Sequence, residues 1–135
     1  MVGSKNGNGS FAELVKQVQW DGLTATFRFA QLSPTLLLVS GTELPPHYHP
    51  CVKIDEYWMV LSDSNPVEIS TSNGLSISGD WTKTIIGPGE YIYIPGDFSR
   101  SARAVGRGSF HLLMSLSEPA SRTPMDQQRR LANSR

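Results

Sequence analysis

Short apolar runs separated by turn residues are the feature that most constrains the fold of this chain. Strand-like segments recur about every eight to twelve residues from Leu23 onward, and no long helical pattern lies between them. Glycine and proline supply most of the turns, because they fit backbone conformations that other residues avoid. We therefore predict an all-β fold, an antiparallel barrel or sandwich. The predicted turns include Ser33-Pro34, Ser72-Asn73-Gly74, Gly87-Pro88-Gly89, Pro95-Gly96-Asp97 and residues 105–108.

The alternation of side chains assigns faces to the predicted strands. Phe27 and Phe29 fall on one face of segment 24–30, as in a half-buried strand. Segment 35–41 is apolar on both faces, which predicts a strand that is packed on both sides. Further on we expect hairpins over 67–77 and 100–116, with a strand between them that has Tyr91 and Tyr93 on one face.

The strand that begins at Glu56 also has two apolar faces. An apolar outer face in so small a domain implies a cover, either an N-terminal helix or a second subunit. We expect a homodimer that buries this outer face. Trp58 and Val60 share the face of Glu56, whereas Tyr57, Met59 and Leu61 form the outer face.

The two ends of the chain differ from its middle. Residues 1–9 are polar and glycine-rich, which predicts a disordered N-terminus. Ser10 and Glu13 form a capping box for a short helix that ends near Val18. We expect one β domain over residues 10–118 and a polar tail over residues 119–135.

Composition argues against several classes of function. Lys plus Arg and Asp plus Glu number 12 each, so no overall field attracts nucleic acid or an anionic membrane. One cysteine cannot form an internal disulfide, and no N-terminal apolar run resembles a signal peptide or a membrane span. We therefore expect a cytoplasmic protein whose partner is a small molecule.

The segment from Gly41 to Glu56 contains the residues best suited to chemistry. His47 and His49 lie two positions apart, so both imidazoles point to one face of an extended strand that flanking prolines stiffen. Glu56 follows His49 by seven residues, an odd offset that would put it on the opposite face of one uninterrupted strand. Pro50 should break the strand, and the loop after it can bring Glu56 back to the face of the histidines. Two histidines and one carboxylate can hold divalent iron or a related metal with open positions. The alternative is a pair of hydrogen-bonded pocket histidines.

A second motif, Gly89 followed after five residues by Pro95, completes a family resemblance. With Gly41, His47, His49 and Glu56 it resembles the two-motif signature of the cupin superfamily, over about residues 35–116. The resemblance implies a cupin-like antiparallel β-barrel or jelly-roll sandwich, here with a short N-terminal helix. It also implies a pocket for a small molecule, and a divalent transition metal (Fe, Mn, Zn or Ni) bound by His47, His49 and Glu56.

Arg100 stands where the second cupin motif has its histidine, the last metal ligand. If it points inward, a permanent cation with five donors lies in or beside the pocket. It can bind an anionic substrate, or it can pair with Glu56 and take that carboxylate from the metal. His111 and Cys51 are the residues that could replace the missing ligand. Their alternatives are a structural strand histidine and a small, half-buried hydrophobe.

Two classes of function follow from these residues. The first is a cupin-type enzyme, of the kind used in specialised metabolism, that acts on a small oxygenated or anionic molecule. Dioxygenase, isomerase, lyase and cyclase chemistry all fit, with His47, His49 and Arg100 as catalytic residues. The enzyme is metal-assisted in one version. In the other it is metal-free, with His47 or His49 as acid or base opposite a tyrosine and Arg100 as substrate anchor. The second class, a non-catalytic ligand-binding module, is less favoured.

Overall fold

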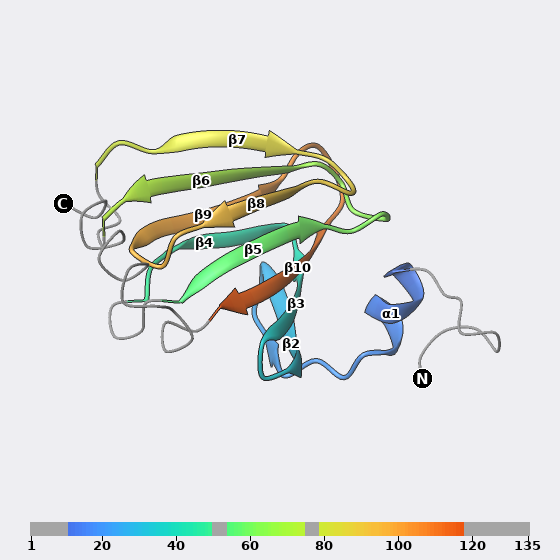
Figure 1. The fold of residues 1–135 in the computed structure, drawn as a ribbon. Helices are drawn as coiled ribbons and strands as arrows, with labels where there is room; N and C mark the ends of the chain where they lie inside the picture. Colours follow the sequence, from blue (N-terminus) through green and yellow to red (C-terminus); the bar gives the residue numbers. More distant parts are fainter. Residues whose placement is uncertain (1–10, 50–53, 75–78, 118–135) are drawn as a thin grey trace.

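The structure, a computed structural model, describes residues 11–49, 54–74 and 79–117 (Figure 1). Within these residues the chain forms one short helix followed by ten strands. In chain order they are α1 (Phe11–Gln17), β1 (Gly22–Leu23), β2 (Phe27–Ser33), β3 (Leu36–Gly41), β4 (Glu43–His47), β5 (Asp55–Val60), β6 (Val67–Asn73), β7 (Thr82–Ile86), β8 (Tyr91–Ile94), β9 (Phe98–Ala104) and β10 (Phe110–Ser117).

The strands form two sheets. A six-stranded sheet has the order β1-β2-β3-β10-β5-β8, and a four-stranded sheet has the order β4-β9-β6-β7. Neighbouring strands in both sheets run antiparallel. In Figure 1, β6, β7 and β9 form the upper layer, and β10, β3 and β2 lie below it. This arrangement confirms the predicted all-β antiparallel sandwich with a short N-terminal helix.

The core lies between the two sheets and follows the alternation of the strands. Trp58 and Val60 of β5 are fully buried, as are Val67 and Ile69 of β6 on the opposite sheet. Leu112 of β10 is buried in the same cluster. β5, β6 and β10 therefore each turn one face to this core, as alternating side chains require. The predicted inward face of the Glu56 strand is confirmed.

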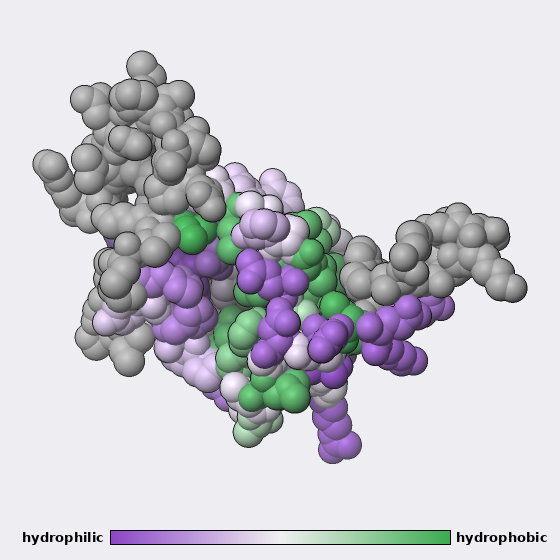
Figure 2. All heavy atoms as spheres, turned by 90° about the horizontal axis from the view of Figure 1, so that it is seen from below, coloured by the Kyte–Doolittle hydropathy of each residue, from purple (hydrophilic) through white to green (hydrophobic). Residues whose placement is uncertain are grey.

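A second, smaller apolar cluster lies beneath α1. Val15 of α1 and Leu38 of β3 are buried together with Leu61, and Trp20 borders them. The prediction that Leu61 faces outward with Tyr57 and Met59 is wrong. Leu61 follows the end of β5 and is only 1% exposed. Figure 2, which views the molecule from below, shows apolar surface in the middle of this side, with hydrophilic side chains on either side of it.

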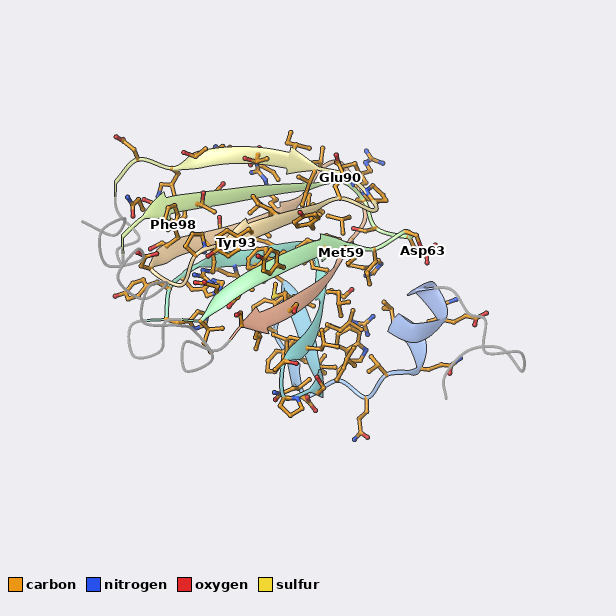
Figure 3. The ribbon with its side chains drawn as sticks, viewed as in Figure 1. Met59, Asp63, Glu90, Tyr93 and Phe98 are labelled. Atoms are coloured by element: carbon orange, nitrogen blue, oxygen red, sulfur yellow. The ribbon has the colours of Figure 1, made fainter. Side chains whose placement is uncertain are left out.

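The outer face of β5 and β8 remains exposed and apolar. Tyr57 and Met59 of β5 are 44% and 41% exposed, and Tyr91 and Tyr93 of β8 are 64% and 43% exposed. The Tyr57 ring lies 5.0 Å from that of Tyr93 and 6.0 Å from that of Tyr91, measured between centroids. Met59 and Tyr93 are labelled on these neighbouring strands in Figure 3. We call these four residues the β5–β8 face.

A homodimer through the β5–β8 face is the expected assembly, because aromatic side chains gathered on an exposed edge of a sheet favour burial. Light scattering at micromolar concentration should give twice the chain mass. Replacing Tyr57 and Tyr91 by serine should shift the protein to monomer. Leu23→Ser is the matched control, because Leu23 is 72% exposed on β1, at the other edge of that sheet. A wild-type monomer would remove the prediction.

The last predicted hairpin is wrong, although its turn is correctly placed. β9 pairs with β4 and β6 in the four-stranded sheet, whereas β10 pairs with β3 and β5 in the other. The turn at residues 105–108 therefore carries the chain from one sheet to the other. Gly106 and Gly108 have φ angles of 81° and 102°, where glycine avoids the strain that a side chain would cause.

Several other predictions are modified or lie outside the described residues. β6 pairs with β7, at residues 82–86, a strand that the sequence pattern does not predict. The expected return strand over 75–77 lies outside the described residues, as do the N-terminus over 1–9, Cys51 and the tail over 119–135. No helix among the described residues is long and apolar enough to span a membrane.

Candidate functional site

A cavity of about 560 Å³ lies between the two sheets and is lined by residues of β2, β3, β4, β5 and β10. Three of the lining residues, His47, His49 and Glu56, carry polar side chains. The predicted inward face of β2 is confirmed. The apolar walls include Phe27 and Phe29 of β2, Leu37 and Val39 of β3, and Met114 and Leu116 of β10.

His47 is held by a backbone contact that fixes its tautomer. Its Nδ1 lies 2.8 Å from the carbonyl oxygen of Pro45, which can only accept a hydrogen bond. Nδ1 therefore donates, and Nε2 is the acceptor of the neutral ring. Burial lowers the pKa of His47, with His49 and Arg100 acting in the same direction against the Pro45 hydrogen bond and Glu56. His47 is thus a neutral base on the cavity wall.

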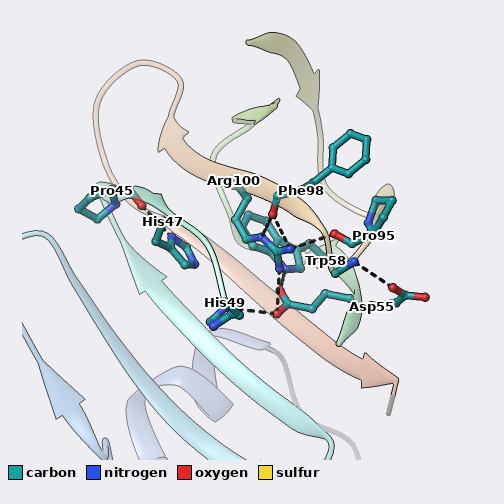
Figure 4. Close-up of polar contacts among 10 residues, drawn as sticks. Pro45, His47, His49, Asp55, Trp58, Pro95, Phe98 and Arg100 are labelled. Carbon is teal, nitrogen blue, oxygen red and sulfur yellow. Dashed lines mark hydrogen bonds and ion pairs between the residues drawn. The ribbon is translucent and has the colours of Figure 1, made fainter. Parts of the chain in front are cut away.

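His49 and Glu56 lie with His47 on the cavity wall, as the sequence predicts. The His47 and His49 rings lie edge to face, with centroids 5.4 Å apart. His49 Nε2 is 3.8 Å from Glu56 Oε2 (Figure 4). Glu56 is 6% exposed, in the stretch where β5 pairs with β8 and β10. Glu56 therefore faces the histidines, as the sequence predicts.

Arg100 and Trp58 engage both oxygens of the Glu56 carboxylate. Trp58 Nε1 donates to Glu56 Oε1 at 2.6 Å, and Arg100 NH1 lies 3.1 Å from Oε2. The contact with Arg100 is a buried ion pair. Of the two arrangements that the sequence left open for Arg100, pairing with Glu56 is the one in the structure.

The guanidinium of Arg100 lies behind Glu56 and does not line the cavity. Arg100 is 0% exposed and stands opposite His47 in the β4–β9 register. Its Nε and NH2 donate to the carbonyl oxygen of Phe98, and NH2 also donates to that of Pro95. Burial lowers the pKa of Arg100 and the charge of Glu56 opposes the shift. Nε and NH2 are therefore bound to backbone carbonyl groups, while NH1 lies against the Glu56 carboxylate.

The side chains as they lie do not fit a divalent metal. Both Glu56 oxygens are engaged, one of them by a cation, and a metal ion would bring a second positive charge to the same oxygen. Among the described residues, no group of three or more His, Cys, Asp or Glu side chains is arranged to hold a metal. The metal-ligand roles of His47, His49 and Glu56 therefore remain predictions.

Two residues that the sequence pattern did not mark as functional, Trp58 and Asp55, stabilise this network. Trp58 was expected only as core, yet its indole N–H binds Glu56. Asp55 accepts the backbone N–H of Gly96 at 2.9 Å and the hydroxyl of Tyr93 at 2.8 Å, which ties the start of β5 to the turn before β9. The acidic pair Asp55-Glu56 at the start of a buried strand was the signal available in the sequence.

His111 lies away from the cavity. Alternation placed it opposite Leu112 and Met114, and the structure agrees, because both of those side chains are buried while His111 Nδ1 lies 2.7 Å from Ser40 Oγ on β3. Burial lowers the pKa of His111. Arg28 on β2 acts in the same direction and Asp63 opposes it. His111 therefore does not join His47 and His49 as a ligand in this geometry.

Acid should destabilise the fold partly through His111. Its pKa is lower in the folded than in the unfolded state, so the unfolded chain takes up the proton first and stability falls as the pH drops through 6.5. His47 acts in the same direction, so the test compares variants. Urea unfolding between pH 5 and 7.5 should show a smaller loss in His111→Gln than in the wild type. Equal losses would contradict the prediction.

Comparison with known proteins identifies the fold. No protein-family model and no curated protein matches the sequence. The cupin domain of Schizosaccharomyces pombe Cnp3 matches with a TM-score of 0.58 and 14% identity, over 86% of this chain and 77% of that chain. KdgF from Halomonas sp. gives 0.53 and 16%, over 78% and 93%. A predicted oxalate decarboxylase from Thermotoga maritima gives 0.60 and 10%, over 76% and 95%.

The chain therefore has a cupin fold, which confirms the resemblance seen in its two motifs. At these identities the likeness shows the fold alone. The matched structures include a predicted decarboxylase and a domain named only as a cupin, so the fold by itself does not define an activity. Function has to be argued from the cavity and its polar residues.

Proposed function

We propose that this protein is a metal-independent acid/base enzyme that moves a proton on a small oxygenated molecule held in the cavity. Isomerase, lyase and cyclase chemistry are the reaction classes that fit. The observation that carries the proposal is the Pro45 contact, which leaves a neutral His47 with Nε2 as acceptor in an apolar cavity. A base at that position can remove a proton from the carbon next to a carbonyl group.

His49 is the candidate acid of the same reaction. His49 Nε2 lies 3.8 Å from Glu56 Oε2, so a carboxylate stands beside the proposed acid. His49 can then give its proton to the substrate oxygen as His47 takes one from carbon, which leaves a neutral enol. Return of the proton from His47 to a different carbon of a conjugated enol, while the enol hydroxyl gives its proton back to His49, completes an isomerisation and restores both histidines. Glu56, fixed by Trp58 and Arg100, keeps His49 in place.

The cavity favours a compact, mostly apolar substrate with few oxygens. Its walls are aromatic and aliphatic, and the polar side chains that line it are the two histidines and Glu56. The charge of Arg100 is compensated by Glu56, so it supports no preference for an anionic ligand. The expected role of Arg100 as substrate anchor is replaced by one as positioning residue. A metal-assisted reaction, dioxygenase chemistry included, would require Glu56 to leave Arg100.

Proton exchange with solvent tests the proposal directly. Chelator-stripped protein is incubated in D2O with a panel of neutral cyclic ketones and diketones, and deuterium at the carbon next to the carbonyl is followed by mass spectrometry. We expect exchange above the buffer rate that added chelator does not abolish. Panel compounds that raise the melting temperature without exchanging would support the non-catalytic binding module instead. Exchange that requires added metal would overturn the metal-independent mechanism.

A further inference from the structure

Three features meet at the Glu56 carboxylate in a way that an acid/base site alone does not require. Arg100 is fully buried, it contacts the carboxylate oxygen nearest His49, and it contributes nothing to the cavity wall. A buried cation is costly to keep unless its charge is compensated. Its place beside Glu56 therefore needs an explanation beyond substrate binding.

The position of the guanidinium provides that explanation. Glu56 Oε2 is the oxygen that lies toward His49, at 3.8 Å from Nε2, and Arg100 NH1 lies 3.1 Å from the same atom. A cation bound between His49 and Glu56 would lie close to this guanidinium. Like charges this close in a buried site repel by several kcal/mol. The positive charge of Arg100 therefore lies where the charge of a bound metal ion would lie.

We propose that Arg100 is a built-in cation that keeps divalent metals out of the cavity, and that its removal opens a metal site formed by His47, His49 and Glu56. Arg100 is the cation that pairs with Glu56 Oε2, at 3.1 Å. Loss of the guanidinium therefore leaves the lone pairs of Oε2 free for another cation. His47 Nε2 already carries the free lone pair that a metal ligand needs, because Nδ1 donates its proton to the carbonyl oxygen of Pro45.

This inference shares its residues with the proposed function but is tested without a substrate, so either can fail alone. Chelator-stripped wild type and Arg100→Gln are titrated with Co²⁺, by calorimetry and by visible absorption. We expect no stoichiometric binding to the wild type. In Arg100→Gln we expect one ion per chain and an affinity at least about a hundredfold higher, the effect of removing several kcal/mol of repulsion.

Matched variants separate the charge of Arg100 from general disruption. Arg103→Gln lies on the same strand and breaks an exposed ion pair with Glu68, so it should behave like the wild type. Arg100→Lys keeps a cation and should still exclude Co²⁺. Combining Arg100→Gln with His49→Ala should abolish the gained binding, which would show that the ion lies at the proposed site.

Three results would overturn the proposal. The first is tight, stoichiometric Co²⁺ binding by the wild type that His49→Ala removes. The second is a folded Arg100→Gln protein that binds no better than the wild type. The third applies if Arg100→Gln is unfolded in the absence of metal. A bound ion should then stabilise its folded state, because ligands that bind only the folded state raise its stability. An Arg100→Gln chain that stays unfolded by circular dichroism with millimolar Co²⁺ therefore also counts against the inference.

Discussion

Replacing His47 by glutamine is expected to lower the rate of substrate proton exchange by about 10²–10⁴-fold, the usual contribution of a positioned acid or base. Glutamine keeps a polar side chain on β4 but cannot take up a proton. Because the change removes the base and leaves the cavity walls intact, the loss should appear in kcat rather than in KM. Steady-state exchange in D2O, followed by mass spectrometry, gives both constants.

The control for His47 is the other histidine with a lowered pKa. His111 is bonded to Ser40 and lies outside the cavity, so His111→Gln should exchange at the wild-type rate. His49→Gln should be slowed as well, since it removes the proposed acid. If His47→Gln and His111→Gln lose activity equally, the effect is structural and the assignment of the base fails.

Removing Arg100 should have the largest effect on stability of any single change at the site. Arg100→Met leaves Glu56 buried at 6% exposure without its cation. Breaking a buried ion pair from one side costs roughly 3–5 kcal/mol, because the remaining charge is uncompensated. Urea unfolding of the wild type and the variant measures this difference.

Two comparisons define the cause of that loss. Arg103→Met breaks the exposed pair with Glu68 and should cost only about 0–1 kcal/mol. The double variant Arg100→Met with Glu56→Gln should be more stable than Arg100→Met alone, because no buried charge is left. Additive losses in the double variant would show that Arg100 stabilises the fold by packing, with no contribution from its pairing with Glu56.

Much of the fold could be predicted because side-chain alternation in strands is a local property. Phe27 and Phe29 share the cavity side of β2, and Trp58 and Val60 share the core side of β5. β7 could not be predicted, because a strand without alternating apolar residues gives no such local signal. Four of its five residues are exposed, as suits an edge strand, so its sequence carries no apolar period.

Sheet membership could not be predicted, because it depends on pairing between distant segments. β9 and β10 follow each other through a short turn, which in sequence looks the same as a hairpin. Only the pairing of β9 with β4 and β6, and of β10 with β3 and β5, shows that they separate. Long-range registers of this kind have no local signature in one sequence.

The site was predictable in its members but not in its contacts. His47, His49 and Glu56 do lie together on the wall of one cavity. The sequence left open whether Arg100 faces a ligand or Glu56, because that choice depends on two backbone carbonyl groups, at Pro95 and Phe98, that orient the guanidinium. Backbone acceptors are present in every sequence and mark no position in particular.

The turn at residues 105–108, the step between the two sheets, connects β10 to the rest of the chain, so β10 can be removed by ending the protein before that turn. β10 lies between β3 and β5 and is the last strand of the described chain, so a protein that ends before the step would present two unpaired strand edges around a vacant slot. A synthetic peptide covering Phe110–Ser117 should complement that truncated protein, and the peptide's dissociation constant would report how strongly one strand holds the sandwich together. If the truncated chain gains no β-sheet signal in circular dichroism when the peptide is added, the two layers cannot form without β10 in covalent linkage.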